Sequence, residues 1–196
     1  MDYFKNDKWH RDGFTPNALQ RELWEWQKEN HLNPIRKYLG LPVRITSCLR
    51  TKEDFDRLLY NGYHPSPTSD HFGTKAIQIP EKYTEKRKTY GEIYQWSTFA
   101  SDISCDTDII GLCRDIYITL ERDRVIIPYM GEVKQLIAES QIINGKKVYW
   151  IHISAPYDAL YSHEASYAIK SMLNTNKYLI SPDGRNYQVT DFTGGF

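Results

Sequence analysis

The chain has 196 residues, a formal net charge of zero, 40% hydrophobic residues and 26% charged residues. This length and composition are typical of one globular domain with a buried core. A chain without net charge has no strong field to attract nucleic acid or an anionic membrane, so we expect neither as a partner.

Targeting signals and cysteines limit the function classes further. No run approaches the roughly 20 apolar residues of a membrane helix, so we expect no membrane insertion. The first residues, MDYFKNDKWHRDGF, contain no apolar core of a signal peptide. Cys48, Cys105 and Cys113 are odd in number and irregularly spaced, which favours a reducing compartment over a disulfide framework. We therefore expect a protein made in the cytoplasm without a signal peptide.

The N-terminal part of the pattern is mainly helical. Residues 1–16 are expected to form an irregular arm, followed by a helix over residues 17–31 and a short second helix over residues 32–38. The β-branched content of residues 43–47 predicts a buried strand, and residues 52–59 predict another helix.

The middle of the chain is less regular. We expect a loop over residues 61–70, a strand over 76–79 and a charged, solvated turn or helix over 81–88. Residues 92–101 predict a helix, and the apolar spacing between residues 102 and 124 predicts a further one.

The C-terminal part contains two predicted hairpins. Strands over residues 133–138 and 148–154 flank an Asn-Gly pair at 144–145, which favours a tight antiparallel turn. A helix is expected over residues 164–174, and a second hairpin lies within residues 178–190.

These elements predict one α+β domain with a small, mainly antiparallel central sheet and flanking helices. We divide the chain into an N-terminal arm (1–16), a single domain (17–175) and a C-terminal hairpin and tail (176–196).

Two stretches carry residues suited to chemistry. The first runs from Ile45 to Ile79 and contains His71, and the second is the strand-like run Trp150-Ile151-His152-Ile153. Two histidines, with the polar side chain of Gln78 seven residues after the first, form the skeleton of a three-ligand metal site.

This pattern resembles the zinc D-alanyl-D-alanine carboxypeptidase family, whose fold is also called hedgehog-type. The family reads roughly I-T-S-x-x-R, a loop, S-x-H-x-x-G-x-A-x-D-I, then Q-L-I-x-E, then W-x-H-I, and the resemblance covers roughly residues 43–155. The matching residues of this chain are Ile45, Thr46, Ser47, Arg50, Ser69, His71, Ala76, Ile79, Gln135, Leu136, Ile137, Glu139, Trp150, His152 and Ile153.

The resemblance implies a zinc site with His71, Gln78 and His152 as ligands. Gln78 stands where the family has an aspartate, and a neutral amide binds zinc more weakly than a carboxylate. We therefore expect zinc to be bound weakly or not at all. Asp70 is adjacent to His71, but on a strand or turn its side chain is expected to point elsewhere. Other side chains that could be recruited as ligands are His64 and His163.

The resemblance also implies roles for three further residues. Glu139 is the candidate general base, with Glu132 as the weaker alternative. Arg50 matches an arginine that pairs with the terminal carboxylate of the substrate, and Ser69 matches a serine that lines the substrate cleft. Each also has a structural interpretation, as a charge at a strand end, an ion-pairing arginine or a turn serine.

Two functions follow. The chain keeps the motifs around the site but lacks the anionic ligand of the family. This favours a catalytically impaired structural or binding component of a bacteriophage virion, which contacts other virion proteins. The alternative is an active zinc metallopeptidase, an endolysin that cleaves peptidoglycan stem peptides. A host-interaction protein that reuses the pocket for a non-peptide ligand is a third hypothesis. Metal content distinguishes the first two.

Overall fold

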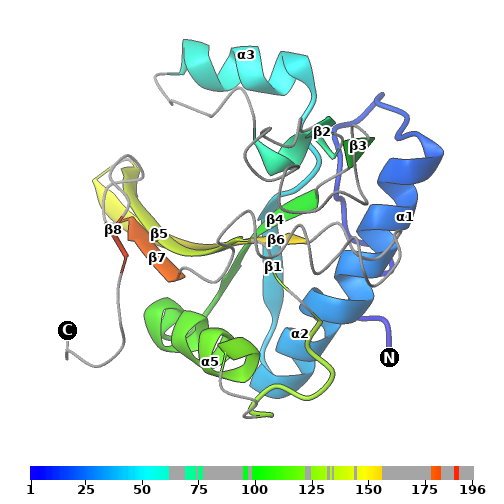
Figure 1. Cartoon of the computed structure of the whole chain (residues 1–196). Helices are drawn as coiled ribbons and strands as arrows, with labels where there is room; N and C mark the ends of the chain where they lie inside the picture. Colours follow the sequence, from blue (N-terminus) through cyan, green and yellow to red (C-terminus); the bar gives the residue numbers. More distant parts are fainter. Residues whose placement is uncertain are drawn as a thin grey trace, which may run out of the picture.

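The protein is described by a computed structural model whose central feature is a six-stranded sheet flanked by helices, an α+β fold (Figure 1). Within the described residues, no helix is both long and apolar enough to cross a membrane. The described residues are 1–61, 69–73, 75–76, 95–96, 99–121, 125–131, 133, 135–143, 145–155, 178–181 and 188–189.

The N-terminal helices confirm the prediction in kind and adjust its boundaries. Helix α1 (Ala18–Gln27) begins at Asn17, whose side chain accepts a hydrogen bond from the backbone N–H of Gln20, as an N-cap does. A single π-helical turn, η1 (Lys28–Leu32), then leads into α2 (Asn33–Leu39). Helix α2 ends at Gly40, which takes the left-handed conformation (φ 65°) that favours glycine.

Helix α3 (Lys52–Tyr60) follows the first strand and confirms the helix predicted there. Thr51 and Asp54 cap its start reciprocally, so the first turn has its backbone donors satisfied. The other elements among the described residues before residue 97 are β1 (Val43–Ser47), the short helix η2 (Asp70–Phe72), β2 (Lys75–Ala76) and β3 (Gln95–Trp96).

The second half of the chain supplies most of the sheet. Strands β5 and β6 meet at the predicted Asn-Gly position, where Gly145 has φ 76° and Ile143 pairs with Lys146, so the predicted hairpin is confirmed. The elements are β4 (Phe99–Cys105), α5 (Ile109–Glu121), β5 (Gln135–Ile143), β6 (Lys146–Ala155), β7 (Tyr178–Ser181) and β8 (Gln188–Val189).

The strands are ordered β1-β4-β6-β5-β7-β8. Every pairing in this sheet is antiparallel except β5 with β7, which is parallel, so the sheet is mainly antiparallel as predicted. Strands β7 and β8 pair with each other, in agreement with the predicted C-terminal hairpin, and β7 adds this hairpin to the main sheet.

The helix predicted over residues 92–101 is wrong in the described part of that range. Gln95–Trp96 forms β3, and β4 begins at Phe99. Strand β4 lies between β1 and β6 and is buried along most of its length, so it lacks the alternation that marks a half-buried strand. The polar pair Ser101-Asp102 also interrupts its apolar run.

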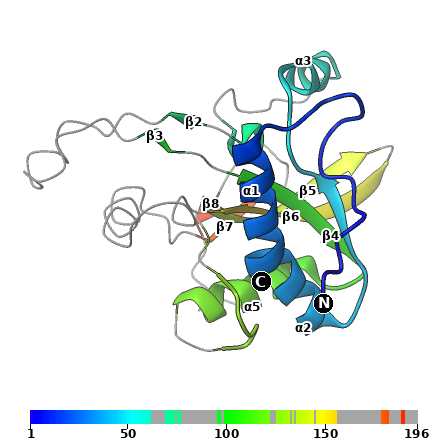
Figure 2. The same cartoon turned by 90° about the vertical axis from the view of Figure 1, so that its right-hand side faces the viewer.

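The two faces of the sheet are covered differently. Helix α1 contacts β4, and α5 contacts β5 and β6, while η2 also contacts β4. Figure 1 shows α3 above the sheet and α2 and α5 below it, and Figure 2 shows α1 crossing in front of the strands. The face that contacts α1, α2 and α5 is called here the helix face, and the face toward η2 and α3 is called the site face.

The N-terminal arm packs on this core despite its irregular backbone. Phe4 is buried, and Trp9 stacks on Trp24 of α1 with ring centroids 5.3 Å apart. The backbone N–H of Leu49 donates to the carbonyl of Trp9 at 2.9 Å, which ties the arm to the end of β1.

Several predicted elements lie outside the described residues. They are most of the loop over 61–70, residues 77–79 of the strand predicted over 76–79, the turn or helix over 81–88 and the helix over 164–174.

Candidate metal centre

His71 reaches the sheet from the short helix η2. Ser69 caps this helix by accepting from the backbone N–H of His71 at 3.3 Å, and Gly73 ends it with φ +70°. The backbone angle favours glycine there, and a Cβ at Gly73 would lie 2.8 Å from Cδ1 of Leu49, whose side chain would have to shift. The turn therefore holds His71 tightly against the site face.

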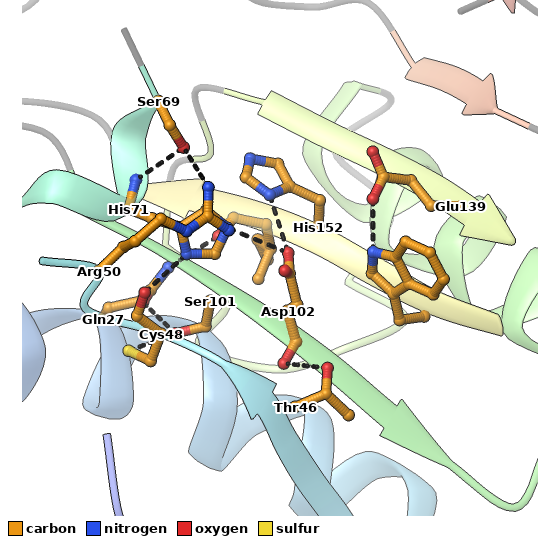
Figure 3. Close-up of polar contacts among 12 residues, drawn as sticks. Gln27, Thr46, Cys48, Arg50, Ser69, His71, Ser101, Asp102, Glu139 and His152 are labelled. Carbon is orange, nitrogen blue, oxygen red and sulfur yellow. Dashed lines mark hydrogen bonds and ion pairs between the residues drawn. The ribbon is translucent and has the colours of Figure 1, made fainter. Parts of the chain in front are cut away.

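Asp102 and His152 face it from adjacent central strands. Asp102 of β4 is paired directly with His152 of β6, and side chains of directly paired residues lie on the same face of a sheet. Figure 3 shows both side chains rising from the site face toward His71.

The three side chains form a compact, buried cluster. Oδ1 of Asp102 lies 2.9 Å from Nδ1 of His152 and 3.2 Å from Nε2 of His71 (Figure 3). The imidazole centroids are 5.0 Å apart, and one nitrogen or carboxylate oxygen from each residue lies within 4.8 Å of the others. The side chains of His71, Asp102 and His152 are only 3%, 13% and 11% exposed.

The tautomer of His71 makes this cluster suited to a cation. Nδ1 of His71 lies 2.7 Å from the carbonyl oxygen of Cys48, and a carbonyl only accepts, so Nδ1 carries a proton. In a neutral imidazole, Nε2 then presents its lone pair to Oδ1 of Asp102 at 3.2 Å. Two acceptors at that distance repel each other unless a proton or a metal ion lies between them.

The charges of the cluster stabilise one another. Burial alone raises the pKa of Asp102, but the charges and hydrogen bonds of the two histidines outweigh it and hold that pKa well below its ordinary value. Burial lowers the pKa of His152, yet its hydrogen bond to Asp102 and the nearby carboxylates bring that pKa above its ordinary value. Asp102 is therefore an ionised carboxylate near neutral pH.

Two imidazoles and one carboxylate are a donor set that zinc accepts in catalytic sites, where three protein ligands leave one position open. Each bond is roughly 2 Å long, so ligand atoms on one ion lie close together, as these do. The hydrogen bond from His71 to a backbone carbonyl is the outer contact that usually orients a ligating histidine. The residues present thus fit a divalent metal ion.

The sequence-based ligand set is only partly represented in this cluster. His71 and His152 come together as predicted, while Gln78 lies outside the described residues. The expected weakness of the site depended on a neutral third ligand, and this argument does not apply to a cluster that contains Asp102.

Asp102 was missed by the sequence reasoning, although the chain carries a pattern that points to it. Ala100-Ser101-Asp102-Ile103 has the A-x-D-I order that the resemblance places over residues 76–79. In this chain the same order occurs much later, in β4, whose first residues fall within the helix predicted over 92–101. The long separation from His71 concealed the match.

Arg50 and Ser69 lie beside the cluster. Nη1 of Arg50 lies 3.4 Å from Oγ of Ser69, and the backbone N–H of Arg50 donates to the carbonyl of His71 at 2.7 Å. Burial lowers the pKa of Arg50, which the charges of Asp102, Asp54 and Glu139 partly offset. A guanidinium thus stands next to the candidate metal ligands.

Glu139 lies on the site face, in β5. It is paired with Trp150 of β6, whose indole Nε1 donates to Oε2 of Glu139 (Figure 3). The charge of Glu139 also contributes to the raised pKa of His152.

The remaining candidates divide into two groups. Asp70 is buried next to His71, and its charge helps to raise the pKa of His152. The alternatives Glu132, His64 and His163 lie outside the described residues.

The chain matches no protein-family model, no curated protein and no solved structure.

Proposed function

We propose that this chain is a zinc-dependent peptidase-like hydrolase of the D-alanyl-D-alanine carboxypeptidase type, acting on peptidoglycan stem peptides. The zinc ligands in this proposal are His71, Asp102 and His152. The alternative, a binding module that has lost its chemistry, followed from the absence of an anionic ligand, and Asp102 supplies one.

The observation that carries the proposal is the position of Asp102 between the two imidazoles. Its Oδ1 approaches a nitrogen of each histidine within 3.2 Å, and His71 is fixed in the tautomer that exposes Nε2. The A-x-D-I order around Asp102 adds support, because it restores the carboxylate that the family resemblance requires.

Bound zinc would supply a Lewis acid for the scissile carbonyl and lower the pKa of a water molecule. The chain's own residues supply the rest. Trp150 donates to Oε2 of Glu139, and we assign Glu139 as the carboxylate that would accept a proton during hydrolysis. Arg50 offers a planar guanidinium for the terminal carboxylate of a stem peptide, and Ser69 orients it.

The experiment compares zinc affinity in the wild type and in single variants of the full chain. Asp102→Asn keeps the shape of the side chain and removes its charge, and Asp106→Asn is the matched control. Asp106 is an exposed aspartate just beyond the same strand, where it pairs with Arg44. We expect Asp102→Asn to weaken zinc binding at least about 100-fold in a chelator competition, because even outer contacts change affinity 10- to 100-fold. Asp106→Asn should bind as the wild type does.

Gln78→Ala separates the two possible third ligands. In this proposal it leaves zinc affinity within about 3-fold of the wild type, since the ligand is Asp102. Release of D-alanine from a stem peptide ending in D-Ala-D-Ala then tests the reaction. A wild type that binds no zinc, or an Asp102→Asn variant that binds it equally well, would overturn the proposal. Zinc binding without release of D-alanine would favour the alternative, a binding module that has lost its chemistry.

A further inference from the structure

Gln27 is a fully buried polar side chain on the opposite side of the sheet from the candidate ligands. It is the last residue of α1, its exposure is 0%, and it lies on the helix face (Figure 3). A buried primary amide is costly unless its donor and acceptor are both used. Its partners therefore indicate what it does.

The two ends of the Gln27 amide bind the two central strands. Nε2 donates to the carbonyl oxygen of Ile153 in β6 at 2.9 Å, and Oε1 accepts from Oγ of Ser101 in β4 at 2.7 Å. Ile153 directly follows the ligand His152, and Ser101 directly precedes the ligand Asp102. One side chain thus spans the two strands at the level of the site.

The third candidate ligand, His71, is connected to Gln27 through Ser101 and Cys48. Sγ of Cys48 lies 3.2 Å from Oγ of Ser101, whose single hydroxyl proton goes to Gln27, so the thiol is the donor. Burial raises the pKa of Cys48 to about 12, which keeps the thiol protonated. The carbonyl of the same residue accepts from Nδ1 of His71 at 2.7 Å.

We infer that Gln27 is a positioning residue for the metal centre. It sets the spacing of His71, Asp102 and His152 from behind the sheet, through the neighbours of these three ligands. This inference rests on the proposed function, because it takes the three residues as the ligands of a metal ion. Gln27 does not touch the metal or the substrate.

A glutamine suits this position for a chemical reason. It offers a donor and an acceptor on one planar amide, so it binds a carbonyl on β6 and a hydroxyl on β4 at once. An apolar side chain of the same length fills the space but leaves both partners to find other hydrogen bonds. The hydroxyl of Ser101 is then released to rotate, and its contact with Cys48 changes.

The test compares Gln27→Met with Asn33→Leu. Both variants replace a buried amide by an apolar side chain of similar volume, and Asn33 binds Tyr3 and Glu29, away from the site. The readouts are the zinc dissociation constant and the visible absorption spectrum of the cobalt-loaded protein, which reports ligand geometry. The nitrogen chemical shifts of His71 in the metal-free protein report its tautomer.

We expect Gln27→Met to weaken zinc binding on the order of 10-fold and to shift the cobalt spectrum, as changes of outer contacts do. The His71 tautomer should become mixed in the same variant. Asn33→Leu should lower stability toward urea while its zinc affinity and spectrum stay unchanged. Ser101→Ala removes the contacts of Oγ with both Gln27 and Cys48 but keeps the hydrogen bond from Gln27 to Ile153. It should act in the same direction with a smaller effect, which provides a second variant if Gln27→Met does not fold.

Two outcomes distinguish a failure of this inference from a failure of the proposed metal site. If the wild type binds zinc and both Gln27→Met and Ser101→Ala keep its affinity and spectrum, Gln27 has no positioning role and the metal site stands. An equal loss of zinc affinity in Asn33→Leu would likewise mean that the loss comes from lower stability of the fold and not from positioning of the ligands. If the wild type binds no zinc, both the metal site and the role of Gln27 are refuted.

Discussion

The two faces of the central sheet are built from alternate residues of the same strands, yet they differ in chemistry. On the helix face, Ile103, Ile151 and Ile153 are fully buried in the apolar core. On the site face, their chain neighbours Asp102 and His152 form a charged cluster. The side-chain period of a strand is two residues, so one strand serves both faces. Stability and chemistry are thereby assigned to neighbouring positions, and single substitutions can separate them.

The polar contacts of the two faces also differ in kind. The site face concentrates ionised groups, with Asp102 between two histidines and Glu139 close enough to influence His152. The helix face has a neutral hydrogen-bond network through Gln27 and Ser101 at the same level. A neutral network is cheaper to bury than a charge, which suits a role in holding the strands in place.

The largest expected effect is on the helix face. Ile103→Ala should lower the free energy of unfolding by about 2–5 kcal/mol, because it leaves a cavity in a fully buried position. Urea denaturation measures this loss. The folded fraction should still bind zinc with wild-type affinity. A large loss of affinity with little loss of stability would show that the two faces are not separable.

The next largest effect is the stabilisation of the folded state by zinc bound on the site face. Zinc at 100 times its dissociation constant should raise the free energy of unfolding by about 2.7 kcal/mol, because it binds the folded state alone. A chelator should reverse the gain, and Asp102→Asn should show none of it. Thermal unfolding with and without zinc measures this effect. Equal stabilisation of the Asp102→Asn variant would contradict the assignment of this cluster as the site.

The smallest expected effect concerns a charge pair on the helix side. Nζ of Lys28 is nearly buried and lies 2.8 Å from Asp2, and this hydrogen bond holds the pKa of Asp2 below its ordinary value of 3.8. A lowered folded-state pKa adds stability above the unfolded pKa, and this stability is lost as the pH falls through the folded value. Asp2→Asn should therefore cost roughly 0.5 kcal/mol at pH 7, a value reduced by solvent screening, and almost nothing near pH 2.

Urea denaturation of the wild type and of Asp2→Asn at both pH values measures this difference. Asp2 has no role in the proposed metal site, so zinc affinity at pH 7 should be the same in both proteins. A cost that persists unchanged at pH 2 would mean that Asp2 does not act through its charge, since asparagine keeps the oxygen that accepts from the backbone N–H of Phe4.

Local sequence determined the elements whose cause is local. The N-cap at Asn17, the capping pair Thr51 and Asp54, and the Asn-Gly turn at 144–145 each act within a few residues. The order of the motifs in the sequence also indicated His71, His152, Arg50 and Ser69 as candidates for one site, and these residues lie near one another in the fold.

Tertiary structure decided the rest. Residues 99–105 form a strand because they pair with β1 on one side and β6 on the other, and both partners are distant in sequence. Local periodicity does not contain that information, so the segment was partly predicted as a helix and Asp102 was overlooked. The same pairing places Asp102 opposite His152 and makes the amide of Gln27 a bridge between their strands. The sequence by itself determined which residue types were present for a candidate metal site, and only strand pairing determined which carboxylate joins the histidines.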